Sequence, residues 1–195
     1  MSTKTTESIT AETPDKLSGK EFEEALILEA GRLETQKLMT MGRYGTMVVM
    51  VDGKWLPVPS YPDFEGVLPG GRQFIIEAKV CSQPSFRIQS DKLKHKQVRH
   101  LLERAEFGVI CLLLLHFTGR VGKTFEDKPM TLAIPVTPAR LGGWEVWEQY
   151  AACKDKKKEF PCLSRELAQS IGKPVRWHTP PRCATVRPDL LPVIA

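Results

Sequence analysis

The chain has 195 residues, of which 42% are hydrophobic, and its formal net charge is +5. This length allows one domain with its own core and leaves little room for a second. The longest strongly apolar run, Val109 to Leu115, is far shorter than the roughly 20 residues that cross a bilayer, so we expect a soluble protein without a membrane partner. The five cysteines lack paired spacing, which favours reduced thiols and a cytoplasmic location.

The two ends of the chain differ in composition from its middle. Residues 1–16 are polar and lack the apolar segment of a secretory signal, which predicts a disordered tail. Residues 153–195 are basic and rich in proline, which indicates a C-terminal extension, and the domain itself is expected over residues 17–152. The basic excess favours a polyanionic partner such as nucleic acid, although many basic proteins bind none.

The first predicted elements are a helix and a hairpin. Ser18, followed three residues later by Glu21, is typical of a capping box, and apolar residues then recur at helical spacing. We expect this helix from about Gly19 to Lys37. The segment from Gly45 to Pro59 predicts two short strands joined at Asp52-Gly53, a pair that favours a type I′ turn.

Two further strands, "DFEGVL" and "RQFIIEAKV", follow as a second hairpin. A loop of three residues, Pro69 to Gly71, places Asp63 directly opposite Glu77, with the two Cβ atoms about 5 Å apart. Because side chains alternate along a strand, Lys79 lies on the same face as Glu77 and Asp63. The pattern therefore predicts two carboxylates and a lysine in one cluster.

Like charges directly opposite each other on a sheet repel, so the carboxylate pair requires an explanation. One interpretation is a hard cation such as Mg²⁺, which binds one or two carboxylates and completes its shell with water and phosphate. The other is a solvated sheet edge at which Lys79 is the salt-bridge partner of both acids. The spacing alone is compatible with either.

The following helix is expected between Ser90 as N-cap and Gly108 as the C′ residue. Gln97 lies in its apolar stripe with Leu93, Leu101 and Ala105, and a buried glutamine needs a partner. That partner is either the local backbone or the carboxylate cluster. The apolar run "VICLLLLHF" predicts a central strand covered on both faces, parallel to the strand before the helix. "MTLAIPV" predicts another strand and "GWEVWEQYAA" another helix.

Five pieces of this sequence stand in an order that resembles the PD-(D/E)xK nuclease superfamily, and more narrowly the RecU-like Holliday junction resolvases. They are GKEFE (Gly19 to Glu23), DFEG (Asp63 to Gly66), FIIEAKV (Phe74 to Val80), KHKQ (Lys94 to Gln97) and GVICLLLLHF (Gly108 to Phe117). The resemblance extends over residues 19–136. It implies an α/β fold of the restriction-endonuclease-like kind, with a mixed β-sheet flanked by helices.

The resemblance also implies roles for the clustered residues. Asp63 and Glu77 would bind Mg²⁺, for which Mn²⁺ can substitute, and Gln97 would be a further ligand or near-ligand. Lys79 would position the attacking water and stabilise the charged transition state. Two more acids are candidates: Glu23 either approaches the site or is a solvated helix carboxylate, and Glu65 lies on the face of Asp63. The family has hydroxyl residues before the aspartate, where this chain has Tyr61 and Pro62.

The implied function is Mg²⁺-dependent, structure-selective hydrolysis of four-way DNA junctions by paired cuts, made by a homodimer. The alternatives are a nuclease of the same superfamily that acts on duplex, flap or single-stranded DNA, and a catalytically inactive DNA-binding relative. Six cations flank the expected site and either contact phosphates or are ordinary surface residues: Arg72, Arg87, Lys92, Lys94, Lys96 and Arg99.

Overall fold

The computed structural model describes residues 9–43, 47–58, 62–89, 92–122, 126–153, 160–181 and 183–195. A six-stranded sheet in the order β13-β11-β8-β6-β5-β2 forms its centre. Strands β6 and β8 are parallel and the other neighbours are antiparallel, which confirms the predicted mixed sheet. The strands are β2 (Thr40–Arg43), β5 (Phe64–Val67), β6 (Gln73–Cys81), β8 (Ile110–Phe117), β11 (Met130–Pro135) and β13 (Lys173–Pro174).

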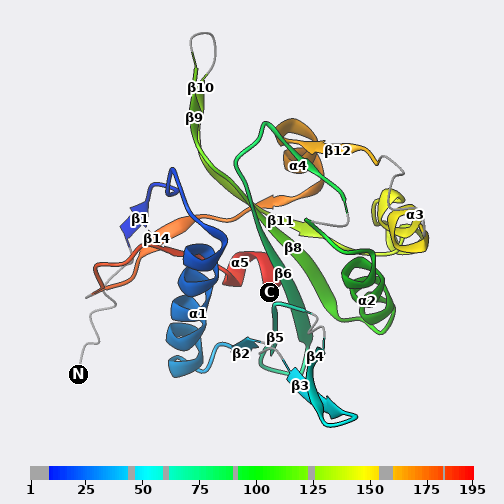
Figure 1. Cartoon of the computed structure of the whole chain (residues 1–195). Helices are drawn as coiled ribbons and strands as arrows, with labels where there is room; N and C mark the ends of the chain where they lie inside the picture. Colours follow the sequence, from blue (N-terminus) through cyan, green and yellow to red (C-terminus); the bar gives the residue numbers. More distant parts are fainter. Residues whose placement is uncertain are drawn as a thin grey trace.

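Helices cover both faces of this sheet (Figure 1). On one face lies α1 with the C-terminal α5, and on the other lie α2, α3 and α4. Helix α2 connects the parallel strands β6 and β8, as the sequence predicts for a crossover. The helices are α1 (Gly19–Thr35), α2 (His95–Glu106), the 3₁₀ turn η1 (Ala139–Leu141), α3 (Val146–Ala152), α4 (Arg165–Ile171) and α5 (Leu191–Ile194).

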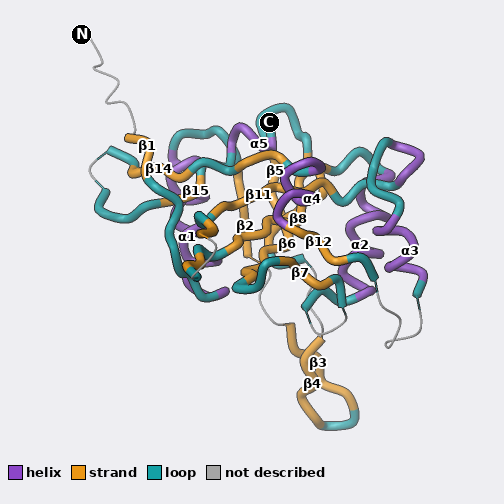
Figure 2. The backbone as a smooth tube through the Cα atoms, turned by 90° about the horizontal axis from the view of Figure 1, so that it is seen from above, coloured by secondary structure: helices purple, strands orange, loops and turns teal. Residues whose placement is uncertain are grey.

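Four smaller strand groups surround the central sheet. Figure 2 shows that the hairpin β3–β4 projects away from the body of the molecule. Its turn residues Asp52 and Gly53 both have positive φ, 50° and 73°, as the predicted type I′ turn requires. The strands are β1 (Ile9–Ala11), β14 (Trp177–Thr179) and β15 (Arg187–Pro188) in one sheet, and the pairs β3 (Met47–Val51) with β4 (Lys54–Val58), β7 (Ser85–Arg87) with β12 (Cys162–Ser164), and β9 (Arg120–Val121) with β10 (Glu126–Asp127).

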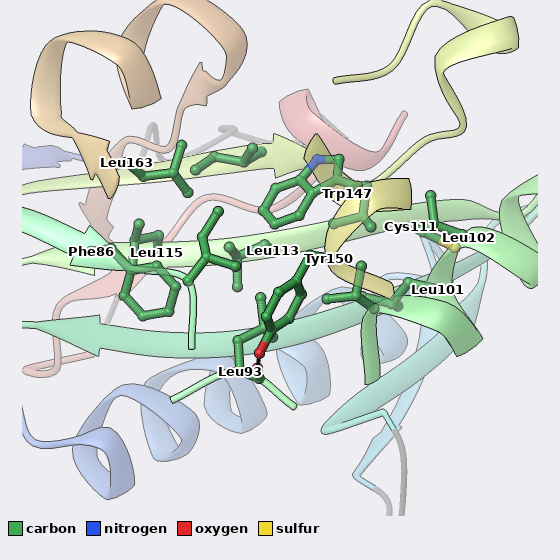
Figure 3. Packing of buried hydrophobic residues seen from close by; sticks show 14 of the residues in the cluster. Phe86, Leu93, Leu101, Leu102, Cys111, Leu113, Leu115, Trp147, Tyr150 and Leu163 are labelled. Atoms are coloured by element: carbon green, nitrogen blue, oxygen red, sulfur yellow. Dashed lines mark hydrogen bonds between the residues drawn. The ribbon is translucent and has the colours of Figure 1, made fainter. Parts of the chain in front are cut away.

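The two hydrophobic cores follow from alternation along the buried strand β8. Leu113 and Leu115 belong to the core under α2 and α3, whereas Leu112 and Leu114 belong to the core under α1. Figure 3 shows part of the first core, in which the hydroxyl of Tyr150 donates a hydrogen bond to the carbonyl of Leu93. This bond ties α3 to the residues that lead into α2.

The start of α1 agrees with the prediction, whereas the helix ends at Thr35, two residues before the expected Lys37. The Ser18 hydroxyl accepts a hydrogen bond from the Glu21 amide at 3.2 Å, and the Glu21 carboxylate accepts one from the Ser18 amide at 2.7 Å. The capping box is therefore confirmed. The start of α2 differs: the helix begins at His95 with Lys94 as N-cap, whereas the predicted cap, Ser90, lies outside the described residues.

The late start of α2 has a local cause. The amide of Leu93 donates to the carbonyl of Gln89 at 2.8 Å, which forms a turn ahead of the helix. The amide of Lys94 then donates to Oε1 of Gln97 at 2.8 Å, so a side chain three residues into the helix satisfies the N-cap. At the other end Gly108 has φ +80°, which confirms the predicted C′ glycine.

The ends of the chain pack against the domain. Residues 9–11 form β1, which pairs with β14, so this part of the predicted disordered tail is structured, and residues 1–8 lie outside the described part. In the C-terminal segment, Trp177 and Val193 are buried in the same core as Phe22 of α1. The segment expected as an extension thus forms part of the second core and adds to the burial of the apolar face of α1.

No helix among the described residues is long and apolar enough to cross a membrane. All five cysteines are free thiols in this structure.

Candidate active site

Strands β5 and β6 pair in the register that the sequence predicts. Phe64 faces Ile76 and Val67 faces Gln73, so the residue before β5, Asp63, comes next to Glu77. The backbone amide of Ala78 donates a hydrogen bond to Oδ2 of Asp63 at 2.9 Å. Asp63 is therefore held at the beginning of β5 by the backbone of the neighbouring strand.

The ammonium group of Lys79 lies between the two carboxylates. Its Nζ is 3.2 Å from Oδ2 of Asp63 and forms an ion pair with Oε1 of Glu77. A third hydrogen bond joins Nζ to the carbonyl oxygen of Ala78 at 3.1 Å. All three side chains predicted to share a face are thus in direct contact.

Gln97 joins the cluster from α2. Its amide nitrogen donates a hydrogen bond to Oε1 of Glu77, and its carbonyl oxygen accepts from the amide of Lys94 at 2.8 Å. The sequence left open whether Gln97 bonds to the local backbone or to the carboxylate cluster, and in the structure it bonds to both. Since the carbonyl oxygen is already used by the helix N-terminus, the side chain orients Glu77 and does not direct its own oxygen into the cluster.

The two carboxylates differ in their burial and therefore in their electrostatic environment. The side chain of Glu77 is 1% exposed and that of Asp63 is 26% exposed. Burial, with the nearby charge of Asp63, raises the pKa of Glu77 to about 7, although Lys79 acts in the opposite direction. Burial lowers the pKa of Lys79, but the attraction of Glu77 and Asp63 outweighs this effect and raises it. The ammonium group therefore stays charged.

A divalent cation fits this set of donors. Mg²⁺ is commonly bound by one or two carboxylates and completes its shell with water and phosphate oxygens. Oε2 of Glu77 is buried without a hydrogen-bond partner, which leaves a strong acceptor available beside Asp63. In the described part of the chain, no group of three or more His, Cys, Asp or Glu side chains is suited to a metal. Any cation here would thus depend on these two carboxylates.

The two additional acids do not reach the cluster. Glu23 on α1 forms an ion pair with Arg43 of β2. Glu65 lies on the face of Asp63, but within the described residues no hydrogen bond or ion pair joins it to Asp63, Glu77 or Lys79; it lines a separate pocket at the edge strand β2. Tyr61, where the family pattern has a hydroxyl residue, lies outside the described residues, and Pro62 is buried.

The six predicted cations are placed at different distances from the cluster. Arg72 precedes β6 and is five residues from Glu77, about 17 Å along an extended strand. Arg99 donates to the carbonyl of Ala151 at 2.8 Å and thereby joins α2 to α3. The other four are exposed. Arg87 ends β7, Lys92 lies in the turn before α2, Lys94 is the N-cap of α2, and Lys96 is in its first turn.

Two residues that support the cluster could not be found from the sequence. His95 stacks on Tyr150 with ring centroids 4.1 Å apart, and its Nδ1 lies 2.7 Å from the carbonyl oxygen of Tyr150. Together with the bond from Tyr150 to Leu93, these contacts fix the first turn of α2, which carries Gln97. The partners are more than fifty positions apart in the chain, and no local motif marks them.

The fold and the site together define a mixed α/β protein with a carboxylate–lysine cluster, Asp63, Glu77 and Lys79, where β5 and β6 meet. No protein-family model matches the chain, and no curated protein matches its sequence. Among solved structures, the chain is similar to that of Archaeoglobus fulgidus Hjc, described as a Holliday junction resolvase from an archaeal hyperthermophile. The identity is 17% and the TM-score 0.44, and the alignment covers 80% of this chain and 95% of that chain.

Proposed function

We propose that this protein is a Mg²⁺-dependent DNA endonuclease that resolves four-way (Holliday) junctions. The observation that carries the proposal is the environment of Glu77, which is buried beside Asp63 and Lys79 and has one oxygen, Oε2, without a partner. Burying a second carboxylate next to the first raises the free energy of the folded chain. A cation that binds both acids during function accounts for this cost.

The side chains of the cluster divide the chemistry between them. When bound, Mg²⁺ would supply Lewis-acid activation of water and charge neutralisation at the phosphate. Lys79 brings a compact positive charge with several donors to the position where negative charge grows in the transition state. Gln97 and the amide of Ala78 hold Glu77 and Asp63 in place, so the carboxylates need not reorganise during the reaction.

The choice of a junction as substrate comes from the resemblance of five ordered motifs to RecU-like resolvases. A four-way junction has near two-fold symmetry and requires two paired cuts, which a C2 homodimer supplies by presenting the same site twice. The net charge of +5 favours a polyanionic substrate. We therefore propose a homodimer as the active form.

Cleavage of a labelled four-way junction tests the proposal, with linear duplex of the same sequence as the comparison substrate. The wild-type protein and the Asp63→Asn variant are assayed with and without Mg²⁺, and Glu103→Gln, an exposed change on α2, serves as the control. We expect paired symmetric nicks on the junction that require Mg²⁺, disappear in Asp63→Asn and persist in the control.

Two outcomes would contradict parts of the proposal. Equal cleavage of duplex and junction would leave a nuclease but remove the resolvase assignment. If Mg²⁺ produces no cleavage although the wild-type protein and Asp63→Asn both bind DNA, Lys79 is only the salt-bridge partner of Asp63 and Glu77. The chain would then be a DNA-binding protein without catalysis.

A further inference from the structure

A pocket of about 440 Å³ opens at the C-terminal end of β6, beyond the carboxylate–lysine cluster. Two of its residues, Cys81 and Phe86, are buried and form an apolar floor. The lining also includes hydroxyl and amide side chains and two cations: Ser82, Gln83, Ser85, Gln89, Arg87 and Lys92.

Lining residues on both sides of this pocket are close in sequence to residues of the cluster or to its supporting contacts. Cys81 follows Lys79 by two residues, so the two lie on the same face of β6 about 7 Å apart. On the other wall, Lys92 stands two residues before Lys94, whose amide is bound by Gln97. Gln97 in turn donates to Glu77. A DNA strand that crosses the carboxylate–lysine cluster along β6 would therefore enter the pocket.

The charged side chains among the described lining residues of the pocket are both cations. Arg87 and Lys92 are exposed, and none of the described lining residues carries a carboxylate. None of the ion pairs formed by the described residues involves either cation. Among the described residues, neither cation therefore has an ionic partner that an anionic ligand would have to displace.

The larger pocket at the edge strand β2, about 800 Å³, has a different character although it flanks the same strands. Its lining includes the carboxylates of Glu34 and Glu65. Its arginines already have partners: Arg43 pairs with Glu23, and Arg104 donates to Gln73 at 2.9 Å. A phosphate there would meet two acids, so the charge favours the smaller pocket.

We propose that the pocket lined by Arg87 and Lys92 binds one backbone phosphate of the strand that is cut, one or two nucleotides from the scissile phosphate. The spacing agrees with this, because phosphates of one DNA strand rise about 3.4 Å per nucleotide along the axis and lie farther apart through space, so about 7 Å along β6 corresponds to one or two nucleotides. The proposal rests on the proposed function for the identity of the strand. Beyond the proposed function, it states a fixed register, that is, a fixed number of nucleotides between the phosphate bound in this pocket and the scissile phosphate at the cluster.

A binding experiment without metal tests this register separately from catalysis. Four-way junctions are prepared with a single neutral methylphosphonate at successive positions through the branch point, and their affinities are measured by fluorescence anisotropy in EDTA. The proteins are wild type, the double variant Arg87→Ala/Lys92→Ala, and a control that removes two exposed cations elsewhere, Lys20→Ala/Lys173→Ala.

We expect the wild-type protein and the control to lose affinity roughly tenfold when one of two adjacent phosphates is neutral, since a charged hydrogen bond is removed. The pocket variant should bind every junction more weakly and show no further loss at those positions. Small losses spread over all positions, or the same position-specific loss in the pocket variant, would overturn the proposal.

Failure of the pocket proposal can be distinguished from failure of the proposed nuclease function. If the position-specific effect appears but Mg²⁺ produces no cleavage, the pocket stands as a phosphate site and the nuclease assignment fails. If junctions are cut and the neutral positions have uniform effects, the nuclease assignment stands and the pocket proposal fails.

Discussion

The side-chain amide of Gln97 donates a hydrogen bond to Oε1 of Glu77, and this contact joins the first turn of α2 to the middle of β6. The same glutamine accepts the N-cap amide of Lys94, so one side chain both begins the helix and orients the buried carboxylate. The position of Glu77 therefore depends on the packing of α2.

Gln97→Ala tests this dependence. The change removes a donor to Glu77 and the acceptor of the Lys94 amide, so we expect a free energy of unfolding lower by about 1–3 kcal/mol. Loss of an orienting partner should also reduce Mg²⁺-dependent cleavage by roughly 10–100-fold. Denaturant unfolding and a Mg²⁺ titration of cleavage measure the two effects.

A helix-surface change in α2, Lys96→Ala, is the stability control for that comparison, because its side chain is exposed. If Gln97→Ala lowers stability but leaves the Mg²⁺ concentration at half-maximal cleavage and the maximal rate unchanged, Gln97 serves the helix alone.

Lys79→Met should separate binding from chemistry. The methionine retains most of the side-chain volume and removes the ammonium group that contacts Asp63 and Glu77. We expect cleavage to fall by at least about 100-fold, as when a group that stabilises developing charge is lost. Junction affinity, measured in EDTA, should change by only a few fold, and a parallel loss of binding would refute the catalytic role.

The raised pKa of Glu77, about 7 against an ordinary 4.5, predicts a pH-dependent stability. As the pH rises, the Glu77 carboxyl keeps its proton to a higher pH in the folded chain than in the unfolded chain. The resulting contribution to the free energy of unfolding is therefore complete below pH 4.5 and is lost as the pH rises to about 7. The loss is on the order of 3 kcal/mol at 1.36 kcal/mol for each pKa unit.

Urea unfolding at pH 5 and pH 8 checks this, with Glu77→Gln as the comparison. The wild-type protein should lose more stability than the variant between the two values, and equal losses would place the titration elsewhere. Because cation binding requires the carboxylate form, cleavage by the wild-type protein should rise through pH 7.

Gly66→Ala should disrupt the edge of the sheet that carries Asp63. A Cβ at Gly66 would lie 2.1 Å from the carbonyl oxygen of Thr40 and 2.4 Å from the ring of Phe74. We expect a loss of about 1–3 kcal/mol in the free energy of unfolding. Gly42→Ala on β2 is the matched control, because a Cβ there meets nothing within 4 Å. Equal thermal unfolding of the two variants would contradict this account.

The sequence determined the local elements and the register of the central hairpin. The capping box of Ser18 and Glu21, the Asp52-Gly53 turn and the alternation in β6 are local, since each depends on neighbours within a few residues. A three-residue loop fixes which strand positions face each other, and this placed Asp63 next to Glu77. The carboxylate–lysine cluster follows from spacing alone.

Only the tertiary structure decided how deeply the cluster is buried and what supports it. The raised pKa of Glu77 and its unpaired Oε2 result from α2 packing over β6, and the first turn of α2 is held in place by His95, whose ring stacks on Tyr150 more than fifty residues away. The C-terminal segment looked like an extension, but Trp177 forms part of the core under α1. Burial is set by all the segments that cover a residue, and most of them are distant in sequence.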